Sequence, residues 1–313
     1  MKSFMHSLFT KSLVTLALAG SFAVSAAAAP KKVLVVTTTT GFRHSSIETA
    51  EVVLEKLGRD SKAFTVEFAR VTPPKGPRKP TAPKDTGDAD KFKAEQAKYE
   101  AALEKFKTDE AQFKMEEKSY AQKQTEVLAA AMSLENLKNF DAVIFANTTG
   151  DLPLPDRQGF IDWVKAGHGF AAMHSGSDTF HGFKPYIEML GGEFEGHGAQ
   201  AGVECLVEDA KHPATKGLGE AYCIEQEEIY LLKSFDRTKV HGLLSLDKHP
   251  NKKKEAGYFP IAWCKDFGQG KVFYTSLGHR EDVWENKRYQ QHILGGLKWA
   301  LGLEAGDATP QAK

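Results

Sequence analysis

Histidines stand at the ends of several apolar segments of this chain. They are His44, which follows residues 33–40, His174 after residues 169–173, His197 in a Gly-His-Gly turn, and His279 after residues 272–277. Apolar runs of this length are typical of buried strands. The carboxyl ends of parallel strands share one edge of an open sheet, where ligands bind. Imidazoles at that edge could bind a metal or transfer protons near neutral pH. The sequence therefore predicts one histidine-lined pocket.

Two kinds of chemistry fit such a pocket. The expected metal ligands are His44, His174, His197 and His279, which together with a carboxylate such as Glu228 would suit Zn²⁺ or a similar divalent ion. Without a metal, the same groups could do acid–base chemistry on a sugar hydroxyl or carbonyl, with His174 at the centre. The expected catalytic residues are His44, His174, Asp178 and Glu228. The chain has no HExxH spacing to select between the two.

Side chains that bind a substrate are expected at the same edge. They are Phe42, Arg43, Asp151, His181, Tyr230 and Trp284. The three aromatic rings among them could stack on a sugar. Nucleophilic catalysis is less favoured, because Ser175 follows the turn residue His174 instead of taking its place. The glycines form neither a P-loop nor a GxGxxG fingerprint, so no nucleotide is expected. The histidines expected to be structural are His212, His241, His249 and His292, with His168 at the far end of its strand.

The elements that would position these side chains alternate between strand and helix. Strands are predicted at residues 32–37, 65–70, 141–147 and 169–174, and helices at residues 47–57, after a cap at Ser45 or Ser46, and 156–165. This order predicts an α/β fold with a doubly wound, mostly parallel sheet of the flavodoxin-like kind. Residues 201–275 favour further strands with an antiparallel edge, residues 287–301 a closing helix, and residues 303–313 a disordered tail.

Residues 73–131 interrupt this pattern and are predicted to be an insertion. Residues 73–87 are rich in Pro, Lys and Gly, which is typical of a linker. A charged helical segment follows, in which large apolar residues recur every seven positions, at Phe92, Tyr99, Phe106, Phe113, Tyr120 and Val127. Three interpretations stay open: a helix that lies against its own domain, a contact for a partner or a homodimer, and a largely disordered insert.

The first 28 residues have the pattern of a secretory signal peptide. Lys2 and Lys11 precede an apolar stretch at residues 13–24, and small residues suitable for cleavage after Ala26, Ala27 or Ala28 follow. The mature protein is therefore expected to be exported, periplasmic or extracellular, without membrane contact after cleavage. The alternative is a retained amino-terminal anchor.

The charge balance bears on possible binding partners, and the cysteine count bears on possible disulfides. Basic and acidic residues balance at 41 each, which gives no support to nucleic-acid binding. Three cysteines, Cys205, Cys223 and Cys264, leave at least one unpaired within the chain. Either Cys205 and Cys223 form a disulfide or the thiols are free and buried.

Several segments together resemble the ThuA-like family, which is named for trehalose utilisation and has the class I glutamine amidotransferase-like fold. They include Gly-Phe-Arg-His-Ser-Ser-Ile at residues 41–47, Asn-Thr-Thr-Gly-Asp at 147–151, Gly-Phe-Ala-Ala-Met-His at 169–174 and Glu-Ile-Tyr at 228–230. The resemblance spans most of residues 30–302, apart from the insertion. It implies a role in carbohydrate metabolism, on keto-sugar or disaccharide derivatives.

The resemblance also argues against amidotransferase activity. In class I amidotransferases the turn after the strand carries a cysteine nucleophile, whereas this chain has His174 there. Two hypotheses follow. The chain is an exported enzyme that acts on a small carbohydrate, as a hydrolase, lyase or isomerase, or it is a non-catalytic glycan-binding or scaffold module that uses the helical insertion for partner contact.

Overall fold

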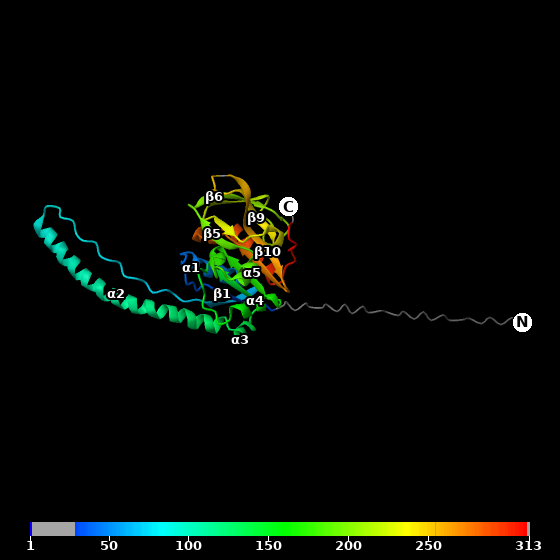
Figure 1. Cartoon of the computed structure of the whole chain (residues 1–313), viewed down its shortest axis with the longest axis horizontal. Coiled ribbons are helices and arrows are strands. Elements are labelled where there is room, and N and C mark those ends of the chain that lie inside the picture. The colour runs from blue at the N-terminus through cyan, green and yellow to red at the C-terminus, as the bar shows by residue number, and fades with distance from the viewer. Residues whose placement is uncertain (2–28, 254, 312–313) are drawn as a thin grey trace.

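The computed structural model describes residue 1, residues 29–253 and residues 255–311. Most of the predicted signal peptide, residues 2–28, lies outside the described residues. A long helix projects from the rest of the described structure (Figure 1). In the part of the chain that the structure describes, no helix is both long and apolar enough to span a membrane.

A nine-stranded sheet forms the centre of the domain, in the order β2-β1-β3-β4-β11-β10-β9-β6-β7. Its parallel half consists of β1 (Lys31–Val36), β2 (Phe64–Ala69), β3 (Ala142–Ala146), β4 (Gly169–Met173) and β11 (Gly270–Thr275). Its antiparallel half consists of β6 (Ala201–Val207), β7 (Ala221–Glu227), β9 (His241–Lys248) and β10 (Ala256–Phe267). A separate antiparallel pair is formed by β5 (Glu193–His197) and β8 (Tyr230–Lys233).

Helices cover both faces of the parallel half. One face packs against α1 (Ile47–Ser61) and α7 (Lys287–Ala300), and the other against α4 (Arg157–Lys165) and α5 (Lys184–Leu190). Strand β1 shows why, because Val33 and Val35 point into the first core and Leu34 and Val36 into the second. The short helices are η1 (His174–Asp178), η2 (Arg237–Lys239), α3 (Leu134–Leu137) and α6 (Glu281–Glu285). The predicted doubly wound α/β fold is confirmed.

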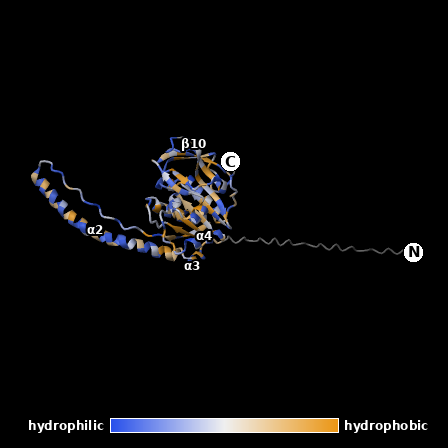
Figure 2. Cartoon of the chain, in the orientation of Figure 1, coloured by the Kyte–Doolittle hydropathy of each residue, from blue (hydrophilic) through white to orange (hydrophobic). Residues whose placement is uncertain are grey.

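The insertion forms an arm that consists of α2 (Ala89–Ala131) and the extended segment before it. The helix has 43 residues, and Figure 1 shows the extended segment running back along it. The heptad stripe faces this segment, since Gly76 lies against the ring of Phe113 and Tyr120 Oη donates to the Val71 carbonyl at 3.4 Å. Polar residues cover most of the remaining helix surface (Figure 2). Only the base of α2 is buried, at Gln124 and Leu128. A homodimer through the arm stays a prediction, which sedimentation of the whole chain would check.

Of the two alternatives for the cysteines of the antiparallel half, the disulfide between Cys205 and Cys223 is not formed. Cys205 is buried, Cys223 is exposed and both are free. Cys205 lies opposite Tyr222 in the register, so the two thiols are one position out of step and on opposite faces of the sheet.

The tail, which was expected to be disordered, is ordered over residues 303–311. There the carbonyl of Gly306 accepts from Trp299 Nε1 at 3.1 Å, and the Gln311 amide donates to the carbonyl of Val240 at 3.3 Å.

Candidate functional site

His174 directly follows β4 and is the first residue of η1. Its backbone has φ of 48°, a left-handed conformation that is uncommon for a residue with a side chain. The side chain is completely buried, and Nδ1 lies 2.9 Å from the main-chain carbonyl of Ser276. Because a carbonyl only accepts hydrogen bonds, Nδ1 carries the hydrogen and donates. The lone pair of the ring is therefore on Nε2, which points away from the Ser276 carbonyl.

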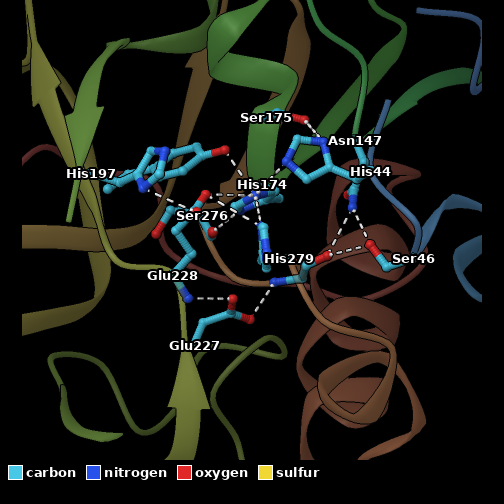
Figure 3. Close-up of polar contacts among 12 residues, drawn as sticks. His44, Ser46, Asn147, His174, Ser175, His197, Glu227, Glu228, Ser276 and His279 are labelled. Carbon is cyan, nitrogen blue, oxygen red and sulfur yellow. Dashed lines mark hydrogen bonds and ion pairs between the residues drawn. The ribbon is translucent and has the colours of Figure 1, made fainter. Parts of the chain in front are cut away.

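Four polar atoms from distant parts of the chain surround His174 Nε2 (Figure 3). They are Tyr230 Oη at 2.8 Å, His44 Nε2 at 3.2 Å, His279 Nδ1 at 3.2 Å and Glu228 Oε2 at 3.6 Å. One lone pair can accept one good hydrogen bond, so it cannot satisfy all these neighbours. His44, His174, Glu228 and His279 each offer one ligand atom, and these atoms all lie within 4.8 Å of one another. We call these four residues the imidazole cluster.

Neighbouring side chains orient the members of the cluster. His44 Nδ1 lies 3.3 Å from Ser175 Oγ. Glu228 contacts His279 Nδ1 through Oε2 at 3.3 Å and His197 Nδ1 through Oε1 at 3.0 Å. His197 thus contacts the cluster through Glu228 and is not one of the four convergent groups. Solvent reaches the cluster on this side, because the side chains of His197 and His279 are 44% and 20% exposed.

Burial sets the protonation of the cluster. It lowers the pKa of His44 to about 4 and that of His174 well below its usual value, so both rings are neutral near pH 7. Burial also opposes the charge on His279, but the hydrogen bond and charge of Glu228 outweigh it and raise the His279 pKa. For Glu228, burial is outweighed by its hydrogen bond to His279 and by the nearby imidazoles, which lower its pKa. Neutral imidazoles and an ionised carboxylate are the forms that bind a divalent metal.

Comparison with known proteins gives the family. The family model described as "Trehalose utilisation", ThuA, matches residues 88–300. The chain belongs to the ThuA family. A ThuA-like protein from Parabacteroides merdae has a similar structure, with a TM-score of 0.59 and 16% identity over 87% of this chain and 90% of that one. A ThuA-like protein from Bacteroides uniformis has a TM-score of 0.57 and 18% identity over 89% and 95% of the two chains. None of the curated proteins matches the chain.

In this ThuA family member, the predicted catalytic residues fall into two places. His44, His174 and Glu228 meet in the cluster, as the strand ends predicted. Asp178 does not contact His174; it pairs with His181 Nε2 at the other end of η1. The opposite ring nitrogen of His181 lies 2.8 Å from Glu193 Oε1. Asp178 and His181 therefore link η1 to β5 beside the cluster, and the structure does not place Asp178 as a proton acceptor for His174.

The other predicted substrate-binding residues have different environments. Phe42 is 68% exposed and packs edge-on against His44 with ring centroids 4.9 Å apart, so it can still meet a ligand. Tyr230 is buried and contacts His174 through its hydroxyl. Trp284 has no exposed surface, because its ring packs on Tyr289 and Nε1 donates to the Gly278 carbonyl at 2.8 Å. The expectation that Trp284 stacks on a sugar is therefore wrong.

Two charged residues that were predicted to bind substrate, Arg43 and Asp151, bond to groups outside the cluster. Arg43 donates to the Thr37 carbonyl at 3.2 Å and to Glu48 at 3.0 Å. Asp151 is exposed and pairs with Arg157 at 3.2 Å. Reasoning from sequence also missed three buried groups beside the cluster. These are the Ser276 carbonyl, the Ser46 hydroxyl and the Glu227 carboxylate. A main-chain carbonyl leaves no trace in residue type, and nothing in the run of residues 225–228 shows which glutamate is buried.

Proposed function

We propose that this ThuA family member is an exported protein that acts on a small carbohydrate at a divalent-metal centre formed by the imidazole cluster. The observation that supports it most is the convergence of His44, Glu228 and His279 on the fixed lone pair of His174 Nε2. Three nitrogens and one carboxylate oxygen are a common donor set for Zn²⁺. A bound Zn²⁺ would act as a Lewis acid on a sugar carbonyl or hydroxyl.

The residues around the centre would supply binding and proton transfer. Phe42 presents an exposed ring next to His44, where it could cover one face of a sugar. His197 is partly exposed and bonded to Glu228, so it could hold or donate a proton at the solvent side. The family name favours a keto-sugar or disaccharide derivative as the substrate. The signal-peptide pattern at residues 1–28 supports export.

Metal titration and turnover test this proposal together. The protein is stripped with a chelator, titrated with Zn²⁺ by calorimetry and assayed on keto-disaccharides with product analysis. We expect one Zn²⁺ per chain, and a loss of affinity of at least about 100-fold in His174→Ala because a ligand is removed. His168→Ala is the matched control, since His168 stacks on Trp163 at the opposite end of β4. Equal affinity in wild type and His174→Ala would contradict the metal centre.

The alternative is a glycan-binding or scaffold module without catalysis. The arm favours it, because most of α2 extends away from the domain and presents a charged surface. Tight sugar binding without turnover, across a panel of sugars and with Zn²⁺ present, would support this second function over the enzyme.

A further inference from the structure

Glu227 precedes the cluster member Glu228 in the chain, and its carboxylate is completely buried. Its Oε1 accepts from the amide of Glu228 at 2.7 Å, and its Oε2 accepts from the amide of Gly278 at 3.0 Å (Figure 3). Within residues 29–253 and 255–311, no lysine or arginine forms an ion pair with it. Both amides belong to the backbone that presents a cluster member, because Glu228 is itself a member and Gly278 precedes His279.

The carbonyl of Gly278 is hydrogen-bonded as well as its amide. Its carbonyl accepts from Asn147 Nδ2 at 2.8 Å, Trp284 Nε1 at 2.8 Å and Ser46 Oγ at 3.2 Å. Gly278 has φ of 116°, and a Cβ built on it would lie 2.7 Å from Tyr289 Oη. The turn before His279 is therefore fixed at the Gly278 amide by Glu227 and at the Gly278 carbonyl by three donors.

A buried carboxylate is costly unless it is hydrogen-bonded, and the amides of Glu228 and Gly278 supply the hydrogen bonds that Glu227 needs. A glutamine of the same size could accept from only one of the two amides, because its NH₂ group would face the other. An aspartate would be too short to reach both. Only a glutamate of this length joins the end of β7 to the turn after β11.

We propose that Glu227 is a positioning residue that fixes the backbone of Glu228 and Gly278. It thereby keeps Glu228 Oε2 and His279 Nδ1 together at 3.3 Å beside His174. The consequence for Zn²⁺ affinity rests on the proposed function, whereas the placement of the His279 ring does not. Groups that orient metal ligands from behind typically change metal affinity by about 10- to 100-fold when they are replaced.

Three variants test the proposal. Glu227→Gln keeps the volume but loses one of the two acceptor oxygens, and Glu227→Asp keeps both acceptor oxygens but shortens the reach. Glu225→Gln is the control, because Glu225 is exposed on the same strand. We expect Zn²⁺ affinity to fall about 10- to 100-fold in the first two variants and to stay unchanged in the control. Glu227→Asp also serves as the milder variant if Glu227→Gln folds poorly.

Imidazole-ring NMR of the metal-free protein separates positioning from general stability. We expect the ring resonances of His279 to move in Glu227→Gln and those of His168 to stay in place. A lower unfolding midpoint with unchanged affinity and an unchanged His279 ring would overturn the proposal, as would wild-type behaviour. If the wild type binds no Zn²⁺, the metal centre fails, and the His279 ring alone then decides: displacement supports the role of Glu227, and no displacement overturns it.

Discussion

The imidazole cluster and the α2 arm are built from opposite kinds of contact. His44 and His279 are more than 200 positions apart in the chain, yet both lie 3.2 Å from His174 Nε2. The arm relies mainly on contacts within one segment of the chain, such as the pair of Lys105 with Asp109 four positions later in α2. Local pairs of this kind contribute only about 0.3–0.5 kcal/mol each. The cluster therefore depends on the whole fold, whereas the arm can change with little cost to the domain.

The largest expected effect is that acid lowers the stability of the domain that holds the imidazole cluster and leaves the arm unaffected. Burial lowers the pKa of His44, His212 and His292 to about 4, and it holds the pKa of His174 well below its usual value. An unfolded histidine has a pKa near 6.5, so below that pH the unfolded chain binds more protons and stability falls as the pH falls toward 4. Each histidine contributes up to about 1.4 kcal/mol per pH unit in that window. Residues 89–131 contain no histidine.

Urea unfolding at pH 7, 6, 5 and 4 checks this prediction. All four tryptophans lie in the domain, at residues 163, 263, 284 and 299, so their fluorescence follows the domain and not the arm. We expect the midpoint to drop steadily below pH 6.5. The same midpoint at pH 6.5 and pH 4 would show that these imidazoles are not buried in neutral form.

Two glycines with positive φ, Gly278 beside the cluster and Gly87 in the arm, allow the packing of the two regions to be compared by substitution. Gly278 has φ of 116° with Tyr289 Oη 2.7 Å from the position of an added Cβ, whereas Gly87 has φ of 84° with nothing within 4 Å. Gly278→Ala combines backbone strain with a clash and should cost about 2–5 kcal/mol. Gly87→Ala carries the strain alone and should cost about 1 kcal/mol. Equal unfolding free energies for the two variants would contradict the close packing around Gly278.

Sequence reasoning found the cluster for a specific physical reason. Buried parallel strands are recognisable as apolar runs, and their carboxyl ends share one edge, so His44, His174 and His279 could be placed together before any coordinates. Glu228 was included as the available carboxylate, and it does lie with them. The arm was also recognisable, because its heptad stripe and Pro-rich linker are local patterns.

The errors concern side chains whose role depends on their neighbours. Trp284 near a site could equally be a sugar platform or part of the core, and the packing of Tyr289 decides for the core. Ser46 stands where a helix cap is expected, but its hydroxyl makes no capping bond to α1 and donates to Gly278 instead. The tail has no periodic pattern, and its order comes from contacts with Val240 and Trp299 that no local sequence signal reveals.

The smallest difference between a variant and its paired control is expected where the arm meets the domain. Gln124, near the base of α2, donates through Nε2 to the buried carbonyl of Thr39 at 2.6 Å. Thr39 lies in the loop between β1 and α1 that carries Phe42 and His44, so this bond connects the arm to the site. Gln124→Ala leaves the carbonyl without that partner and should cost about 1–2 kcal/mol in urea unfolding. Gln122→Ala is the control, because Gln122 is exposed and bonds only to Glu126 within the helix, and it should cost less than about 0.5 kcal/mol. If Gln124→Ala is as stable as the control, the arm is not energetically connected to the loop, and any effect of the arm on the cluster must come from another contact.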